Sequence, residues 1–127
     1  MSGLTYDAGA LIAAARDDRR VWAIHTRALA KGRRPVVPTV VLVEVCRAGQ
    51  QVSLERFLNG CQIEPLTEQA ARTAGTMLGA CRIDVGAVDA AVVESALRRG
   101  DAIVTSNITH LEAVADGVGR KVDLIAI

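Results

Sequence analysis

The segment AVDAAVVESALRRGDAIVTSNITHL, residues 87–111, has the pattern of a helix, a short strand and a second helix. Apolar residues recur at helical spacing in its first half and form one face: Val88, Ala91, Val92 and Ala96. Two arginines and then Gly100 follow this face, which is typical of a helix C-terminus. Residues 102–105 are β-prone, and residues 108–115 have a helical pattern. The segment therefore predicts a helix–strand–helix unit.

The composition favours one small α/β domain spanning residues 1–127. Apolar residues make up 50% of the chain but aromatic residues only 2%, so the core must consist mainly of small aliphatic side chains. Such side chains suit helices packed closely on a parallel sheet. We expect the three cysteines, an odd number in apolar segments, to be reduced core residues of a cytoplasmic protein. We expect neither a signal peptide nor a membrane span.

Strand and helix patterns alternate along the whole chain. Strands are expected at residues 4–6, 35–38, 61–66, 102–105 and 121–127. Besides the two helices above, helices are expected at residues 8–15, 19–31, 40–47, 50–59 and 68–81, although the β-branched segment 40–47 is nearly as compatible with a strand. Thr39 and Thr67 are suitable N-caps for the helices that follow them. The alternation predicts a parallel sheet with helices on both faces.

Three acidic residues stand at related places in this pattern. Asp7 ends the first strand, Glu44 lies about one turn into the helix after the second strand, and Asp89 opens the helix before the fourth strand. Because the carboxyl ends of parallel strands share one edge, we expect the three carboxylates to converge. Converging carboxylates repel each other unless a cation compensates them, and all-oxygen ligands select Mg²⁺ or Mn²⁺. Such ions activate water for attack on phosphodiesters, which favours a nuclease.

Each acid alone has a simpler structural interpretation. Asp7 is a suitable N-cap for residues 8–15, and Asp89 is a suitable cap for its own helix. Glu44, between two valines, is as compatible with a salt bridge as with a functional role. Only the joint placement of the three residues favours a metal site. The two histidines and three cysteines have no zinc-site spacing.

Four blocks resemble, in order, the motifs of PIN-domain ribonucleases, and most closely the VapC toxins of VapBC toxin–antitoxin pairs: TYDAGALIA, VVPTVVLVEVCRAG, VDAAVVESALRRGDAIVTSN and THLEAV. The resemblance implies a three-layer α/β/α sandwich around a parallel sheet of four or five strands. It also implies Mg²⁺- or Mn²⁺-dependent endonucleolytic cleavage of RNA and inhibition by a cognate VapB-like antitoxin. Asp7, Glu44 and Asp89 match the family's first three acids, and Thr105 is expected to orient Asp7 or a metal-bound water.

The chain departs from the family pattern at three positions. Asn107 replaces a frequent fourth acid and offers one neutral oxygen as a possible ligand. His110 stands at a second common Asp position and is either a phosphate donor or a helix-surface histidine. Gly9 replaces a frequent serine, which predicts weaker support for Asp7. Asp84 is a candidate to compensate for the missing acid, or an ordinary loop residue.

Basic residues form four clusters that are expected to flank the site and hold the RNA backbone, or to be solvated surface: Arg16/Arg19/Arg20, Lys31/Arg33/Arg34, Arg98/Arg99 and Arg120/Lys121. Asp101 is expected to be solvated. The Ala-rich helices at residues 8–15 and 19–31 are candidate surfaces for the antitoxin or for a homodimer. Because Asn107 is not an acid, the alternative is a catalytically weak or inactive PIN-like module that binds RNA or a partner protein.

Overall fold

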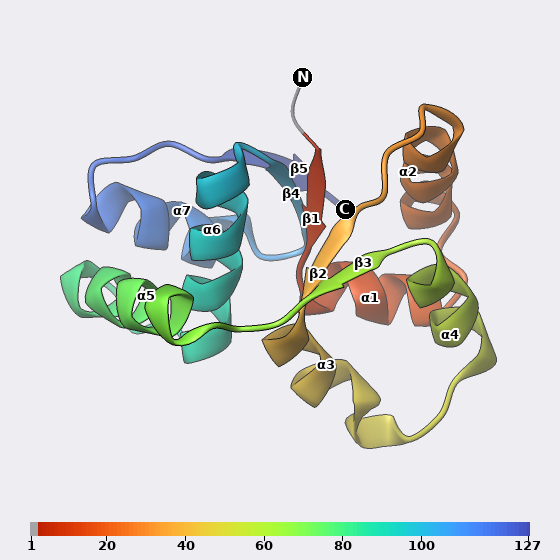
Figure 1. The fold of residues 1–127 in the computed structure, drawn as a ribbon, viewed down its shortest axis with the longest axis horizontal. Helices are drawn as coiled ribbons and strands as arrows, with labels where there is room; N and C mark the ends of the chain where they lie inside the picture. The colour runs from red at the N-terminus through yellow and green to blue at the C-terminus, as the bar shows by residue number, and fades with distance from the viewer. Residues whose placement is uncertain (1–2) are drawn as a thin grey trace.

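A computed structural model describes residues 3–127 and has a five-stranded, fully parallel sheet at its centre (Figure 1). The strands lie in the order β3-β2-β1-β4-β5. Their bounds are β1 Leu4–Tyr6, β2 Val36–Pro38, β3 Gln62–Glu64, β4 Ala102–Thr105 and β5 Asp123–Ala126. The predicted parallel sheet is thereby confirmed, with five strands.

Helices cover both faces of the sheet, as expected for an α/β/α arrangement (Figure 1). Helix α6 packs on β1, β2 and β4, with α5 and α7 beside it, while α1 packs on the other side with α2, α3 and α4. Their bounds are α1 Ala8–Ala15, α2 Arg19–Ala30, α3 Thr39–Val45, α4 Val52–Asn59, α5 Glu68–Ala80, α6 Ala87–Arg99 and α7 Ile108–Gly117, with a 3₁₀ turn at Cys46–Ala48. Within the described part of the chain, no helix is long and apolar enough to cross a membrane.

Helix α6 is buried along its middle, from Ala90 to Ala96, because it lies between the sheet and helices α5 and α7. Small side chains on this helix let it approach the sheet closely. On the opposite face, the few aromatic residues gather in one cluster. His25 is 2% exposed, stacks on Phe57 with ring centroids 3.9 Å apart, and lies 3.0 Å from the Tyr6 hydroxyl. Burial lowers the pKa of His25, so the cluster favours the neutral ring.

The two predicted threonine caps have different outcomes. Thr67 caps α5 by accepting a hydrogen bond from the Ala70 amide, as predicted. The prediction for Thr39 is wrong, because α3 begins at Thr39 itself and Pro38 is its N-cap. The Thr39 hydroxyl instead accepts from the Leu66 amide at 3.2 Å and ties α3 to the segment after β3.

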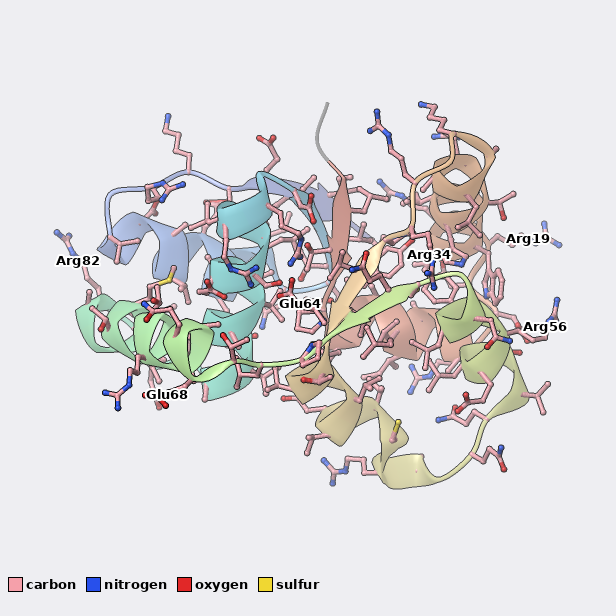
Figure 2. The ribbon with its side chains drawn as sticks, in the orientation of Figure 1. Arg19, Arg34, Arg56, Glu64, Glu68 and Arg82 are labelled. Atoms are coloured by element: carbon pink, nitrogen blue, oxygen red, sulfur yellow. The ribbon has the colours of Figure 1, made fainter. Side chains whose placement is uncertain are left out.

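The prediction that Asp101 is solvated is wrong, because Asp101 belongs with Arg98 and Arg99 to an ion-pair network at the end of α6. Arg98 and Arg99 both bind Glu64 of β3, at 2.7 and 2.5 Å, and Arg99 also binds Asp101 at 3.0 Å. Asp101 is only 7% exposed and accepts a hydrogen bond from Thr5 of β1. Figure 2 shows Glu64 between β3 and α6, where its charge is compensated from within the protein. This arginine pair is therefore engaged in holding α6 to the sheet.

The strand order reverses between β1 and β4, at the centre of the sheet. From β1 the chain moves outward to β2 and β3, and it then returns to the other side of β1 to form β4 and β5. Loops on the two sides of such a reversal diverge and leave a crevice at the carboxyl ends of the strands. Asp7 follows β1 and Thr105 ends β4, so both residues lie at this reversal.

Candidate active site

Asp7 is held in one orientation by two elements, α1 and β4. It is the N-cap of α1, and its Oδ1 accepts a hydrogen bond from the Ala10 amide at 3.0 Å. Its Oδ2 accepts from the hydroxyl of Thr105, the last residue of β4. Burial raises the pKa of Asp7, and the negative charge of Asp89 raises it further, while the bonds from Thr105 and Ala10 act in the opposite direction. The prediction that Asp7 caps α1 is correct, because Oδ1 makes the capping bond. The other oxygen, Oδ2, is bound by Thr105 at the centre of the site.

Thr105 connects Asp7 to the loop after β4. Its side chain is fully buried, donates to Asp7 and accepts a hydrogen bond from the Asn107 amide at 2.8 Å. This second bond turns the chain from the strand into α7, of which Asn107 is the N-cap residue. Thr105 thus fixes the position of Asn107 relative to Asp7.

Asp89 approaches the same place from the first turn of α6. Its Oδ2 lies 3.5 Å from Nδ1 of His110, which in turn lies 2.9 Å from Nδ2 of Asn107. A continuous series of contacts therefore joins Asp7 and Asp89 by way of Thr105, Asn107 and His110. Sequence reasoning left the role of His110 open. Its three-residue separation from Asn107 is the signal for this contact, because such pairs meet on one side of a helix turn.

Glu44 is the predicted acid that the structure does not join to the others. It lies on α3, is exposed and makes no hydrogen bond or ion pair with any described residue. Among residues 3–127, no three His, Cys, Asp or Glu side chains converge closely enough to hold a metal ion. The pair that the fold brings together is Asp7 and Asp89.

The donors at this pair suit a hard divalent cation. Two carboxylates face each other closely enough for Asp89 to affect the pKa of Asp7, and a cation beside both would offset that repulsion. The third donor, the Asn107 side-chain oxygen, is neutral, and oxygen donors of this kind favour Mg²⁺ or Mn²⁺ over zinc. The residues present therefore fit a divalent ion held by Asp7, Asp89 and Asn107, with Glu44 on the adjacent helix.

The remaining polar candidates lie around this pair. Asp84 is exposed in the loop before α6 and makes no polar contact with any other described residue. Ser106 is exposed, and its hydroxyl lies where a side chain on Gly9 would be. Of the other basic residues, Arg34 donates to the Cys61 carbonyl, whereas Arg19 and Arg56 extend from the outer sides of α2 and α4 (Figure 2).

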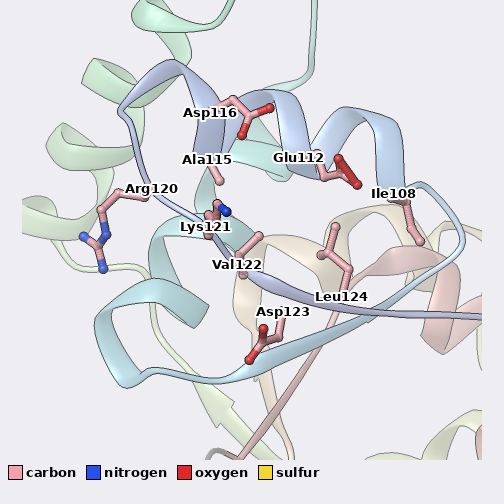
Figure 3. Close-up of a pocket in the computed structure, with 9 residues that line it drawn as sticks. All are labelled: Ile108, Glu112, Ala115, Asp116, Arg120, Lys121, Val122, Asp123 and Leu124. Carbon is pink, nitrogen blue, oxygen red and sulfur yellow. The ribbon is translucent and has the colours of Figure 1, made fainter.

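A surface pocket lies apart from these residues, between α7 and β5 (Figure 3). Its lining carries both signs of charge, with Glu112 and Asp116 on α7 opposite Lys121 and Asp123. None of the residues in the Asp7–Asp89 series lines this pocket. It is therefore separate from the candidate active site.

The family model for the PIN domain matches residues 5–116. The chain belongs to the PIN domain family. This match confirms the family predicted from the four sequence blocks, and it spans Asp7, Glu44, Asp89 and Asn107. PIN domains are generally nucleases that use divalent metal ions, so membership places the chain among hydrolases acting on nucleic acids.

Solved structures with this PIN fold include toxin–antitoxin complexes. The fold is similar to VapBC2 from Rickettsia felis, bound to a promoter DNA fragment, with a TM-score of 0.76, 16% identity and 98% of each chain covered. It is also similar to DNA-bound VapBC from Salmonella typhimurium, with a TM-score of 0.70, 21% identity and 98% of each chain covered. A toxin–antitoxin complex from Klebsiella pneumoniae has a TM-score of 0.65 and 14% identity, covering 98% of this chain and 97% of that one. No curated protein matches the sequence.

Proposed function

We propose that this PIN domain is a metal-dependent endoribonuclease, the toxin of a VapBC-type pair. The observation that carries the proposal is the placement of buried Asp7 beside Asp89 at the reversal of strand order. Membership of a nuclease family and similarity of fold to VapBC complexes support it.

In this proposal, Asp7, Asp89 and Asn107 hold the ion, and Glu44 contributes from α3. When bound, Mg²⁺ or Mn²⁺ polarises the phosphodiester and lowers the pKa of the attacking water. Thr105 and the Ala10 amide keep both oxygens of Asp7 in place, so the carboxylate needs little rearrangement during the reaction. Surface arginines and lysines outside the Arg98–Arg99 network would neutralise RNA phosphates, and RNA binding would then weaken with salt.

The proposed partner is a VapB-like antitoxin that inhibits the nuclease, and we further propose a homodimer that acts in the cytoplasm. Support for the antitoxin comes from the similarity of the fold to VapBC and toxin–antitoxin complexes. The three cysteines among the described residues are all free, but only Cys61 is buried as expected, whereas Cys81 is partly buried and Cys46 is exposed. Co-expression with the product of a short adjacent reading frame should yield a complex that no longer cleaves RNA. Light scattering of the isolated chain measures the oligomeric state.

The central experiment is cleavage of end-labelled RNA by the purified chain with Mg²⁺ or Mn²⁺, and with a chelator added. We expect metal-dependent internal cleavage, reduced about 100-fold or more in Asp7→Asn and Asp89→Asn. Asp116→Asn, which removes an exposed acid of α7, is the matched control and should retain activity. Glu44→Gln should lower the rate, with exposed Glu55→Gln as its control. Equal cleavage by wild type and the two aspartate variants would contradict catalysis at this site.

A non-catalytic PIN module is the second candidate, because Glu44 makes no contact with the other acids and Asn107 is not an acid. The same assay separates the two. A folded wild-type chain that binds RNA but cleaves none of it with either metal would favour the module.

A further inference from the structure

Asn107 has an unusual arrangement for a residue at the start of a helix. Asparagine is favoured at N-caps because its side-chain oxygen accepts a hydrogen bond from an amide in the first helical turn. Asn107 is the N-cap of α7, but its side chain makes no capping hydrogen bond. Its Nδ2 instead lies 2.9 Å from Nδ1 of His110. The side-chain amide is therefore directed to the imidazole of His110 and not to a backbone N–H in the first turn of α7.

This contact determines which end of the amide is available. Nδ2 only donates, so with the amide in this orientation Nδ1 of His110 accepts and the neutral ring carries its proton on Nε2. The other end of the amide, Oδ1, accepts no hydrogen bond from any described residue. The end of the Asn107 side chain that points away from His110 is thus an oxygen without a hydrogen-bond partner among the described residues. The opposite orientation of the amide would place the N–H₂ group there.

The pair formed by Asn107 and His110 is anchored next to both acids. The backbone N–H of Asn107 donates to the Thr105 hydroxyl, which in turn donates to Asp7. On the other side, Nδ1 of His110 lies 3.5 Å from Oδ2 of Asp89. Asn107 is therefore connected to each carboxylate through one intervening residue, to Asp7 through Thr105 and to Asp89 through His110.

We propose that His110 is a positioning residue that fixes the Asn107 amide so that Oδ1 is a neutral ligand for the divalent ion. The inference rests on the function proposed above. A carboxylate has two equivalent oxygens and presents one in either orientation, whereas an amide repels a cation with its N–H₂ end. A site with Asn in place of an acid therefore needs a partner that holds the amide. His110 is the group in this chain that does so.

The test is a cycle of Mn²⁺-binding measurements on the full chain by electron paramagnetic resonance at one fixed pH. We expect His110→Ala to weaken Mn²⁺ binding about 10-fold, as loss of a group that orients a ligand does. In the Asn107→Asp background, the same His110 replacement should change the affinity less than about two-fold, because the carboxylate needs no orientation. Thr109→Ala, an exposed neighbour in the same turn, is the control.

Rescue and tautomer measurements separate positioning from a general structural role. His110→Asn places an amide oxygen the same number of bonds from Cβ as Nδ1, so it should retain most of the affinity. Nitrogen NMR of the metal-free chain, recorded at a pH where the His110 imidazole is neutral, should find the ring proton on Nε2.

A proton on Nδ1, or an equal loss of affinity in both backgrounds, would overturn this inference alone. If the wild-type chain shows no saturable Mn²⁺ binding, or if Asp7→Asn does not abolish that binding, the proposed metal-dependent function is overturned as well.

Discussion

Gly9 has no side chain, and the hydroxyl of Ser106 lies in the space that one would fill. A Cβ added at Gly9 would be 2.1 Å from Ser106 Oγ, 3.1 Å from its Cβ and 3.3 Å from its amide nitrogen. The sequence suggested that the missing hydroxyl at position 9 leaves Asp7 with weaker support. In the structure, Thr105 and the Ala10 amide support Asp7, and the glycine admits the loop after β4.

At this residue scale, Gly9→Ala should lower the free energy of unfolding by about 1–3 kcal/mol, because the added methyl collides with Ser106. It should also slow RNA cleavage, since the collision displaces the loop that carries Asn107. Urea denaturation and the cleavage assay measure the two effects. Gly75→Ala in α5, where a Cβ meets nothing within 4 Å, is the control and should be neutral or stabilising.

The double variant Gly9→Ala/Ser106→Gly removes both Oγ and Cβ from the collision and should recover most of the lost stability. If Gly9→Ala instead behaves like Gly75→Ala, the close approach of the loop to α1 is wrong.

At the scale of the elements, helix α6 is tied to strand β3 through the carboxylate of Glu64. Arg98 and Arg99 at its C-terminus bind Glu64 of β3, and Ser95 donates to the same carboxylate at 2.9 Å. Burial alone would raise the pKa of Glu64, but the bonds from Arg98 and Ser95 and the charge of Arg99 lower it to about 2. Because Asp89 lies at the other end of α6, this network also helps to fix the height of that acid above the sheet.

The lowered pKa of Glu64 predicts a pH dependence of stability. The folded-state pKa lies below the ordinary value of 4.5, so the stabilisation is complete above about pH 5 and is lost as the pH falls toward 2. Glu64→Gln should cost about 2–3 kcal/mol at neutral pH and flatten the stability curve between pH 5 and 2.

Urea titrations at a series of pH values measure this dependence. Glu68→Gln breaks the exposed Glu68–Arg72 pair and should cost less than about 0.5 kcal/mol. The same acid-side slope in wild type and Glu64→Gln would show that another carboxylate is responsible.

On the scale of the whole molecule, the order of the strands brings the site together. Asp7, Thr105 and Asn107 meet because β1 and β4 are neighbours, although about a hundred residues separate them in sequence. Asp89 and His110 come from helices that cover one face of the sheet, whereas Asp7 begins a helix on the other face. An ion bound between these acids would therefore link the two helical layers.

Such an ion should stabilise the entire fold, because it binds the folded chain and not the unfolded one. At ten times the dissociation constant, Mn²⁺ should add about 1.4 kcal/mol, or roughly 5 °C in melting temperature. Asp7→Asn and Asp89→Asn should lose this increase, and Asp116→Asn should keep it. Differential scanning calorimetry with increasing Mn²⁺ measures it. An increase that survives both aspartate variants would assign the ion to another place.

Local patterns were enough to predict most of the elements. The bounds of β1, α1 and β4 agree with the sequence prediction, and Gly100 ends α6 in the left-handed conformation expected of a helix stop. These features depend on the spacing of apolar residues and on nearby caps, which a short segment already contains. The family, too, was recognisable from ordered motifs, and the family model confirms it.

Packing settled the contacts among charged and polar side chains. Asp101 looked solvated, yet Thr5 and Arg99 enclose it, and His110 looked like a surface residue, yet it joins Asn107 to Asp89. Glu44 was expected beside the other acids, and the structure shows no contact with them. A side chain's partners depend on which distant strands and helices become neighbours. Residue type and spacing along the chain do not contain that information.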